Sequence, residues 1–235
     1  MVVSWLGGRF YQAANDWGEQ EGVRRRLYYR PVYQASRMQS LLSQLSAMTG
    51  VEIAGFALTI AAIWLAARNH WLTWPLQVLS GLLYVWLFAQ VNLFGEAALN
   101  GLYIALALYG AWNWRSSHGD KPTVAISRMG AADHAVLWGV GLTATLLVGQ
   151  MQVHFLPTDL PWLDSTVFVF GVLGQWLQAR RKLENWPLWI ILDLLSAAIY
   201  LVKGLQVTAL LYVLLAGLAG YGWWDWSCRI RRAYA

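Results

Sequence analysis

The chain has 235 residues, of which 58% are hydrophobic and only 12% are charged. Soluble domains carry about a quarter charged residues, so this composition excludes a soluble globular protein and indicates one that crosses a membrane several times. The net charge of +5 does not indicate nucleic-acid binding, because the basic residues lie mostly between apolar runs, where they set membrane topology. The single cysteine, Cys228, excludes an internal disulfide and a cysteine metal site.

Residues 1–46 are polar and rich in arginine, with apolar side chains interleaved, and this pattern predicts an amphipathic surface helix that is broken near Pro31. Seven apolar runs follow, each long enough to cross a membrane. The predicted spans are 47–67, 72–91, 96–114, 132–153, 163–180, 187–203 and 206–227.

The apolar runs repeat along the chain. A shift of 112 residues places Trp64-Leu65 on Trp176-Leu177 and the motif 109–114 (Y-G-A-W-N-W) on 221–226 (Y-G-W-W-D-W). In the middle span a shift of 116 places Gln77, Ser80 and Tyr84 on Asp193, Ser196 and Tyr200, which requires the loop after the second span to be four residues longer than its counterpart.

The repeat predicts an all-α membrane protein with seven transmembrane helices arranged as 3+1+3. The first unit is 47–115, the linker helix lies within 116–155, the second unit is 160–228, and residues 229–235 form a basic tail. Because one extra helix returns the chain to its starting side, the two units should point the same way, as a parallel repeat about an axis along the membrane normal.

The distribution of Lys and Arg predicts the orientation of the spans. Nearly all basic residues between the spans fall on one side, which the positive-inside rule makes cytoplasmic together with the C-terminus. These residues are Arg68, Arg115, Lys121, Arg128, Arg180, Arg181, Lys182, Arg229, Arg231 and Arg232, whereas the loops of the other side hold only Lys203. The arginine-rich N-terminal segment opposes this orientation.

A polar stripe runs along the sixth span. Helical spacing places five side chains on one face, opposite Ile191 and Leu194; they are Asn185, Trp189, Asp193, Ser196 and Tyr200. Polar groups inside a span are costly in lipid, so this face should meet a protein interior or a water-filled path. Two interpretations remain open: the stripe lines a site for a polar or cationic solute, or it only packs against neighbouring helices.

Other spans carry polar residues at matching spacing: Glu96, Asn100 and Tyr103 in the third, Gln175 and Gln178 beside Trp176 in the fifth, and Thr73, Gln77, Ser80, Tyr84 and Gln90 in the second. Amides, hydroxyls and indoles that converge from several helices suit a solute with a flat ring and several hydroxyl groups. The enzyme motifs H-E-x-x-H, G-x-S-x-G and the P-loop are absent from the sequence, so we expect no enzyme, cofactor or metal.

Residues 50–228 resemble the PnuC family of vitamin transporters. The resemblance is carried by R-N-H-W-L-T-W-P, by L-Y-I-A-L-A-L-Y-G-A-W-N-W and especially by G-Q-W-L-Q-A-R-R-K-L-E-N-W-P-L-W-I-I-L-D. It implies a homotrimer in the bacterial inner membrane, with a fold like that of the sugar-transporting SWEET proteins. It also implies import of nicotinamide riboside by facilitated diffusion, with the vitamin trapped by a cytoplasmic kinase.

The resemblance places Gln175, Trp176, Asn185, Trp186 and Trp189 in the substrate region, with Asn100 and Tyr103 as further candidates. The polar faces of the spans add Asp193, Tyr200 and Gln90. Alternatives stay open, because the family also has thiamine- and riboflavin-type branches, and because a receptor-like or enzyme-subunit role without transport would also suit a membrane protein.

Overall fold

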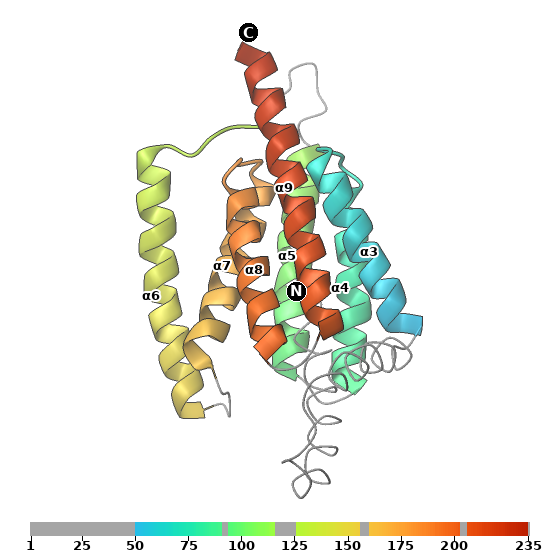
Figure 1. Ribbon diagram of the computed structural model, residues 1–235, viewed down its shortest axis with the longest axis vertical. Coiled ribbons are helices and arrows are strands. Elements are labelled where there is room, and N and C mark those ends of the chain that lie inside the picture. Colours follow the sequence, from blue (N-terminus) through green and yellow to red (C-terminus); the bar gives the residue numbers. More distant parts are fainter. Residues whose placement is uncertain (1–49, 91–93, 116–125, 156–159, 203–205, 235) are drawn as a thin grey trace, which may run out of the picture.

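The computed structural model describes residues 50–90, 94–115, 126–155, 160–202 and 206–234, and within these ranges the chain forms seven helices and no strand (Figure 1). The helices are α3 (Gly50–Ala67), α4 (Thr73–Gln90), α5 (Phe94–Arg115), α6 (Ala131–Phe155), α7 (Pro161–Ala179), α8 (Asn185–Val202) and α9 (Gln206–Tyr234). The predicted spans match these helices within a few residues at most ends. The surface helix predicted in residues 1–46 lies outside the described residues.

The end of α9 differs from the prediction, which placed it near residue 227. The helix continues to Tyr234 with arginines in its last turn. No glycine or proline follows Gly222, so nothing in the local sequence stops the helix where the apolar run stops. The polar extension therefore projects beyond the rest of the bundle, at the end marked C in Figure 1.

The outer surfaces of the helices are apolar. Helix α6, helix α8 and residues 206–233 of α9 are each long and apolar enough to cross a membrane. Helix α6 buries only Leu137, Gly141 and Gly149, and α8 turns Ile191 and Leu194 outward, as the stripe predicted. Exposed apolar faces of this extent suit lipid rather than water.

Six of the helices form a closed ring. Each helix in the order α3, α4, α5, α7, α8, α9 packs against the next one, and α9 packs against α3, which closes the ring. Helix α6 stands outside this ring against α7, at one side of the molecule (Figure 1). The α5–α7 and α3–α9 contacts join the two halves of the chain, so any space enclosed by the ring lies between the halves.

The same turn occurs twice, 112 residues apart. Asn69 and Arg181 hold matching left-handed backbone conformations, with φ of 55° and 53°. Before each turn a guanidinium group lies over the indole four residues earlier, at 4.7 and 4.9 Å from the ring centroid; the pairs are Arg68 over Trp64 and Arg180 over Trp176. The cation–π contacts and the tight turn fix how α4 leaves α3 and how α8 leaves α7.

A pair of perpendicular indoles also recurs. Trp74 meets Trp114 edge-to-face at 5.2 Å and 87°, and Trp186 meets Trp226 at 5.3 Å and 89°. A glycine lies against the first ring of each pair, where a Cβ would collide with the ring; these glycines are Gly110 and Gly222. Perpendicular packing is a favoured geometry for aromatic pairs.

These contacts correct the repeat of the middle span. Trp74 and Trp186 are equivalent by packing, and α4 and α8 begin at residues 73 and 185 and end at 90 and 202. The offset is therefore 112 throughout, and the predicted offset of 116, with its longer loop after the second span, is wrong. The polar residues matched at an offset of 116 are displaced by four residues, about one helical turn, from the equivalent positions. A shift of one turn keeps side chains on the same helical face, so the mismatch looked like a repeat.

Two indoles donate hydrogen bonds from one half of the ring to the other. The Nε1 of Trp114 donates to the carbonyl of Ala179 at 3.0 Å, and the Nε1 of Trp226 donates to the carbonyl of Ala66 at 3.2 Å. Both acceptors lie at the C-terminal end of a helix, where carbonyls have no partner within their own helix; the carbonyl of Ala66 also accepts from the backbone N–H of Asn69 at 2.8 Å. The relation of the two units by an axis along the membrane normal stays a prediction.

We predict that the end of the molecule carrying these turns is cytoplasmic. The α3–α4 turn, the α7–α8 turn and the C-terminus all lie at the upper end of Figure 1, and they carry Arg68, Arg180 and Arg229. Green fluorescent protein fused after residue 235 should therefore fluoresce, and alkaline phosphatase fused there should be inactive. Fusions after Val202, at the opposite end of α8, serve as the control and should behave in the reverse way; the opposite pattern at both positions would refute the orientation.

Candidate functional site

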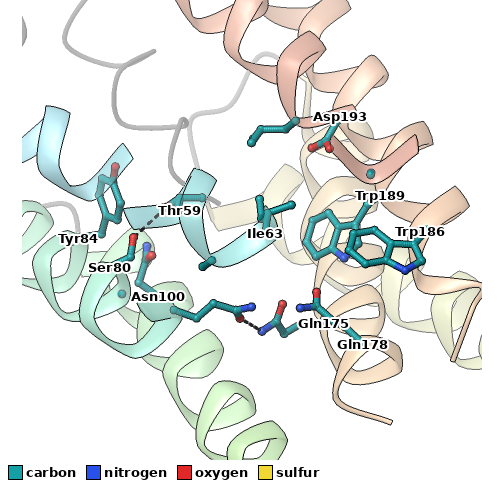
Figure 2. A pocket seen from close by; sticks show the side chains of 15 residues that line it. Thr59, Ile63, Ser80, Tyr84, Asn100, Gln175, Gln178, Trp186, Trp189 and Asp193 are labelled. Atoms are coloured by element: carbon teal, nitrogen blue, oxygen red, sulfur yellow. Dashed lines mark hydrogen bonds between the residues drawn. The ribbon is translucent and has the colours of Figure 1, made fainter. Parts of the chain in front are cut away.

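The ring of helices encloses a pocket that every one of its six members lines. The space between the lining atoms is about 760 Å³, counted with the part open to solvent. The lining residues are Thr59, Ala62 and Ile63 of α3, Gln77, Ser80, Gly81 and Tyr84 of α4, Asn100 of α5, Gln175 and Gln178 of α7, Trp186, Trp189 and Asp193 of α8, and Leu215 and Ala219 of α9 (Figure 2).

A chain of hydrogen bonds crosses the pocket wall from α7 to α3. Gln175 donates from Nε2 to Oε1 of Gln77, whose own Nε2 donates to the Thr73 hydroxyl at 3.0 Å. Thr73 in turn donates to the carbonyl of Ala62 at 2.8 Å. The amide pair joins the two halves of the ring, because α4 and α7 come from different halves, and it holds both glutamine side chains in fixed orientations.

Two hydroxyl groups form a second polar cluster on the other side of the pocket. Thr59 and Ser80 lie 2.9 Å apart between their hydroxyl oxygens, and both reach the carbonyl of Gly55, at 3.0 and 3.1 Å. Figure 2 shows this pair near Tyr84 and Asn100. Since α3 and α4 supply the groups, the cluster belongs to one half of the ring.

Two indoles form the aromatic wall of the pocket. Trp186 is almost fully buried, and its edge-to-face contact with Trp226 holds it rigidly. Trp189 is half-buried and lies against Gly174, where a Cβ would stand 3.3 Å from the ring. Figure 2 shows the amides of Gln175 and Gln178 on one side of these indoles and the carboxylate of Asp193 on the other.

Some polar groups at the pocket lack partners within the part of the chain that the structure describes. The Nε2 of Gln178 and the Nε1 of Trp186 are buried donors with no hydrogen-bond acceptor there. A buried donor left unpaired costs about 1–3 kcal/mol. A ligand with a carbonyl or hydroxyl oxygen would supply the missing acceptor.

Five of the ten predicted site residues come together at this pocket; they are Asn100, Gln175, Trp186, Trp189 and Asp193. They come from three helices, and the predicted polar face of α8 does turn inward, with Asn185, Asp193 and Ser196 buried.

The other five predicted site residues do not line the pocket. Trp176 lies outside the pocket lining, under the guanidinium group of Arg180. Asn185 is buried at the start of α8, where its amide donates to the carbonyl of Lys182. Tyr200 stacks on Tyr212 at 5.5 Å. The remaining two are Tyr103, which is buried with its hydroxyl close to Gly171, and Gln90, which is exposed at the end of α4.

The predicted substrate region does not include several residues that line the pocket. Gln77, Ser80 and Tyr84 share one face of α4 at helical spacing, and Gln178 lies one turn after Gln175. All four are polar residues within predicted spans, and their helical spacing is the sequence signal for their place in the site. The contributions of Thr59, Leu215 and Ala219 had no such signal, because ordinary apolar helices contain the same residue types.

A sequence model of the family described as nicotinamide mononucleotide transporters matches residues 49–228. The chain belongs to this family. Its members are membrane transporters, so the chain is a membrane transporter and not an enzyme.

Several characterised relatives cover most of the chain. The riboflavin/roseoflavin transporter RibM of Streptomyces davaonensis is 28% identical over 186 residues, which is 77% of this chain and 86% of RibM. The nicotinamide riboside transporter PnuC of Escherichia coli is 22% identical over 215 residues, covering 80% and 90% of the two chains. PnuC of Neisseria mucosa is 28% identical over 169 residues, covering 66% and 64%.

The fold has a counterpart among solved structures. The crystal structure of the vitamin B3 transporter PnuC superposes with a TM-score of 0.65 at 19% identity, covering 87% of this chain and 94% of that one. This likeness, together with the seven helices of the described residues, confirms the predicted all-helical fold.

Proposed function

We propose that this transporter imports nicotinamide riboside across the bacterial inner membrane. The observation that carries the proposal is the pocket between the halves of the ring, where Trp186 and Trp189 meet the amides of Gln175 and Gln178. An indole face suits a pyridine ring, and buried amides suit a carboxamide and ribose hydroxyls. The relatives named nicotinamide riboside transporters support the same substrate.

A second candidate substrate is riboflavin. RibM, which is named a riboflavin/roseoflavin transporter, is 28% identical to this chain over most of its length. Indoles and amides would also accept a flavin ring with its carbonyl groups. Thiamine is a third candidate from the family resemblance. Titration of the three vitamins into detergent-solubilised protein separates the proposals: we expect the riboside to bind most tightly, and tighter binding of riboflavin or thiamine would replace it as the substrate.

We further propose that transport is facilitated diffusion, with phosphorylation in the cytoplasm keeping the gradient inward, and that the protein works as a homotrimer. These proposals rest on the family resemblance. Among the described residues no group of three or more His, Cys, Asp or Glu side chains is placed to hold a metal ion, and Asp193 is the one acidic residue among those that line the pocket.

Vesicle uptake tests this mechanism. In vesicles without a kinase, nicotinamide riboside should equilibrate to equal inside and outside concentrations, at a rate that an imposed proton or sodium gradient leaves unchanged. Vesicles that contain a riboside kinase and ATP should accumulate the phosphorylated product. If unmodified riboside rises above the outside concentration under an ion gradient, the transporter is coupled and the diffusion mechanism is excluded.

A further inference from the structure

Asp193 stands out among the described acidic side chains. It is only 7% exposed, it lines the pocket, and none of the hydrogen bonds or ion pairs within the described residues reaches its carboxylate. Two other aspartates have partners: Asp133 lies 3.7 Å from Lys182, and Asp225 accepts a hydrogen bond from Arg229 at the polar end of α9. The carboxylate inside the pocket therefore lacks the kind of counter-charge that these aspartates have.

No described residue of the pocket lining supplies a positive group to this carboxylate. Of the described residues that line the pocket, Asp193 is the only charged one; the others carry amides, hydroxyls, indoles or apolar side chains. An ionised carboxylate buried without a partner is strongly disfavoured, and within a membrane span it marks a site for a charged solute or a proton. Its position in the pocket makes it accessible to a bound solute.

The two indoles favour the same kind of solute. Trp186, Trp189 and Asp193 follow one another at i, i+3 and i+7 on one face of α8, so all three face the pocket together. An indole face attracts a cation through its quadrupole, and the carboxylate attracts it by direct charge. A ring that is both flat and positively charged would use both attractions, whereas a neutral ring would leave the carboxylate unpaired.

We propose that Asp193 is the counter-ion for a cationic aromatic ring, so that the pocket selects positively charged vitamins over neutral ones of similar shape. This inference rests on the proposed function and adds the charge class of its substrate. The pyridinium of nicotinamide riboside and the thiazolium of thiamine carry a permanent positive charge. The flavin of riboflavin is neutral.

A matched pair of ligands tests the proposal directly. Nicotinamide riboside and its reduced dihydro form share the carboxamide and ribose, but only the oxidised form carries the ring charge. Wild-type protein should bind the oxidised form about ten- to hundredfold more tightly. Asp193→Asn should lose most of this preference by weakening the oxidised form while leaving the reduced form nearly unchanged.

Two further variants keep the result interpretable. Asp193→Glu retains the charge and should retain the preference, even if the longer side chain lowers affinity for both ligands. Asp225→Asn removes an equal charge from the polar end of α9, outside the pocket lining, and should bind both ligands like the wild type. Thermal unfolding of each variant in detergent identifies loss of fold; if Asp193→Asn does not fold, the wild type and Asp193→Glu still give the ligand preference.

The outcomes separate this inference from the proposed function. Equal wild-type affinity for both riboside forms, or equal weakening of both by Asp193→Asn, would overturn the counter-ion role while leaving riboside as the substrate. Binding of thiamine without riboside would replace the proposed substrate and keep the charge selection. Binding of riboflavin alone would overturn both the proposed substrate and the counter-ion role of Asp193. If a pH gradient drives uptake in the wild type but not in Asp193→Asn, the carboxylate carries a proton during transport and is not a counter-ion for the ring.

Discussion

Replacing Trp189 by alanine is expected to weaken nicotinamide riboside binding at least tenfold, whereas replacing Trp176 should leave it nearly unchanged. Trp189 lines the pocket and lies against Gly174, so its ring has a fixed orientation toward a bound ligand. Stacking of a base-like ring on an aromatic side chain contributes about 1–3 kcal/mol, which corresponds to roughly ten- to hundredfold in affinity.

Trp176 is the matched control because it is also a half-buried tryptophan that packs against the same cluster of apolar residues, around Leu177 and Leu188. Its indole contacts Arg180 and does not line the pocket. The measurement is isothermal titration of the riboside into each variant, with unfolding temperatures compared first. Equal losses for both variants would mean that the indoles act through stability alone, and a loss confined to Trp176→Ala would place the ligand outside this pocket.

Replacing Trp226 by alanine is expected to destabilise the protein by about 3–5 kcal/mol, the usual range for removing a fully buried large aromatic side chain. The Trp226 side chain is completely buried. It packs edge-to-face on Trp186 and donates its Nε1 hydrogen to the carbonyl of Ala66. The substitution therefore opens a cavity, removes support from an indole of the pocket and breaks a hydrogen bond between the two halves of the ring.

Trp224 gives a control from the same helix, because its side chain is 61% exposed. Trp224→Ala should change stability by no more than about 0.5 kcal/mol. Thermal unfolding in detergent should show a fall of about 10 °C for Trp226→Ala and little change for Trp224→Ala. Trp226→Phe, which keeps a ring but not the donor, should lie between them. A Trp226→Ala protein as stable as the parent would mean that the crossing indoles do not hold the halves together.

The sequence by itself determined the class of the protein and the positions of its helices. Apolar runs separated by basic turns are local properties, and in lipid a run of this kind has to satisfy its backbone hydrogen bonds internally, as a helix. The repeated motifs at 109–114 and 221–226 also indicated equivalent packing, which the paired indoles Trp114 and Trp226 display. The inward face of α8 followed from helical periodicity, and its burial agrees.

Only the tertiary structure decided which polar residues share a pocket. Periodicity identifies the residues on one helical face, but it does not say which neighbour that face meets. Trp176 and Gln175 are adjacent in sequence, yet the ring order puts Gln175 against Gln77 of the other half and Trp176 under Arg180. Likewise, Thr59 and Leu215 became pocket residues because α9 closes the ring against α3. That closure brings together residues more than 150 positions apart in the sequence, and local sequence patterns do not predict such a contact.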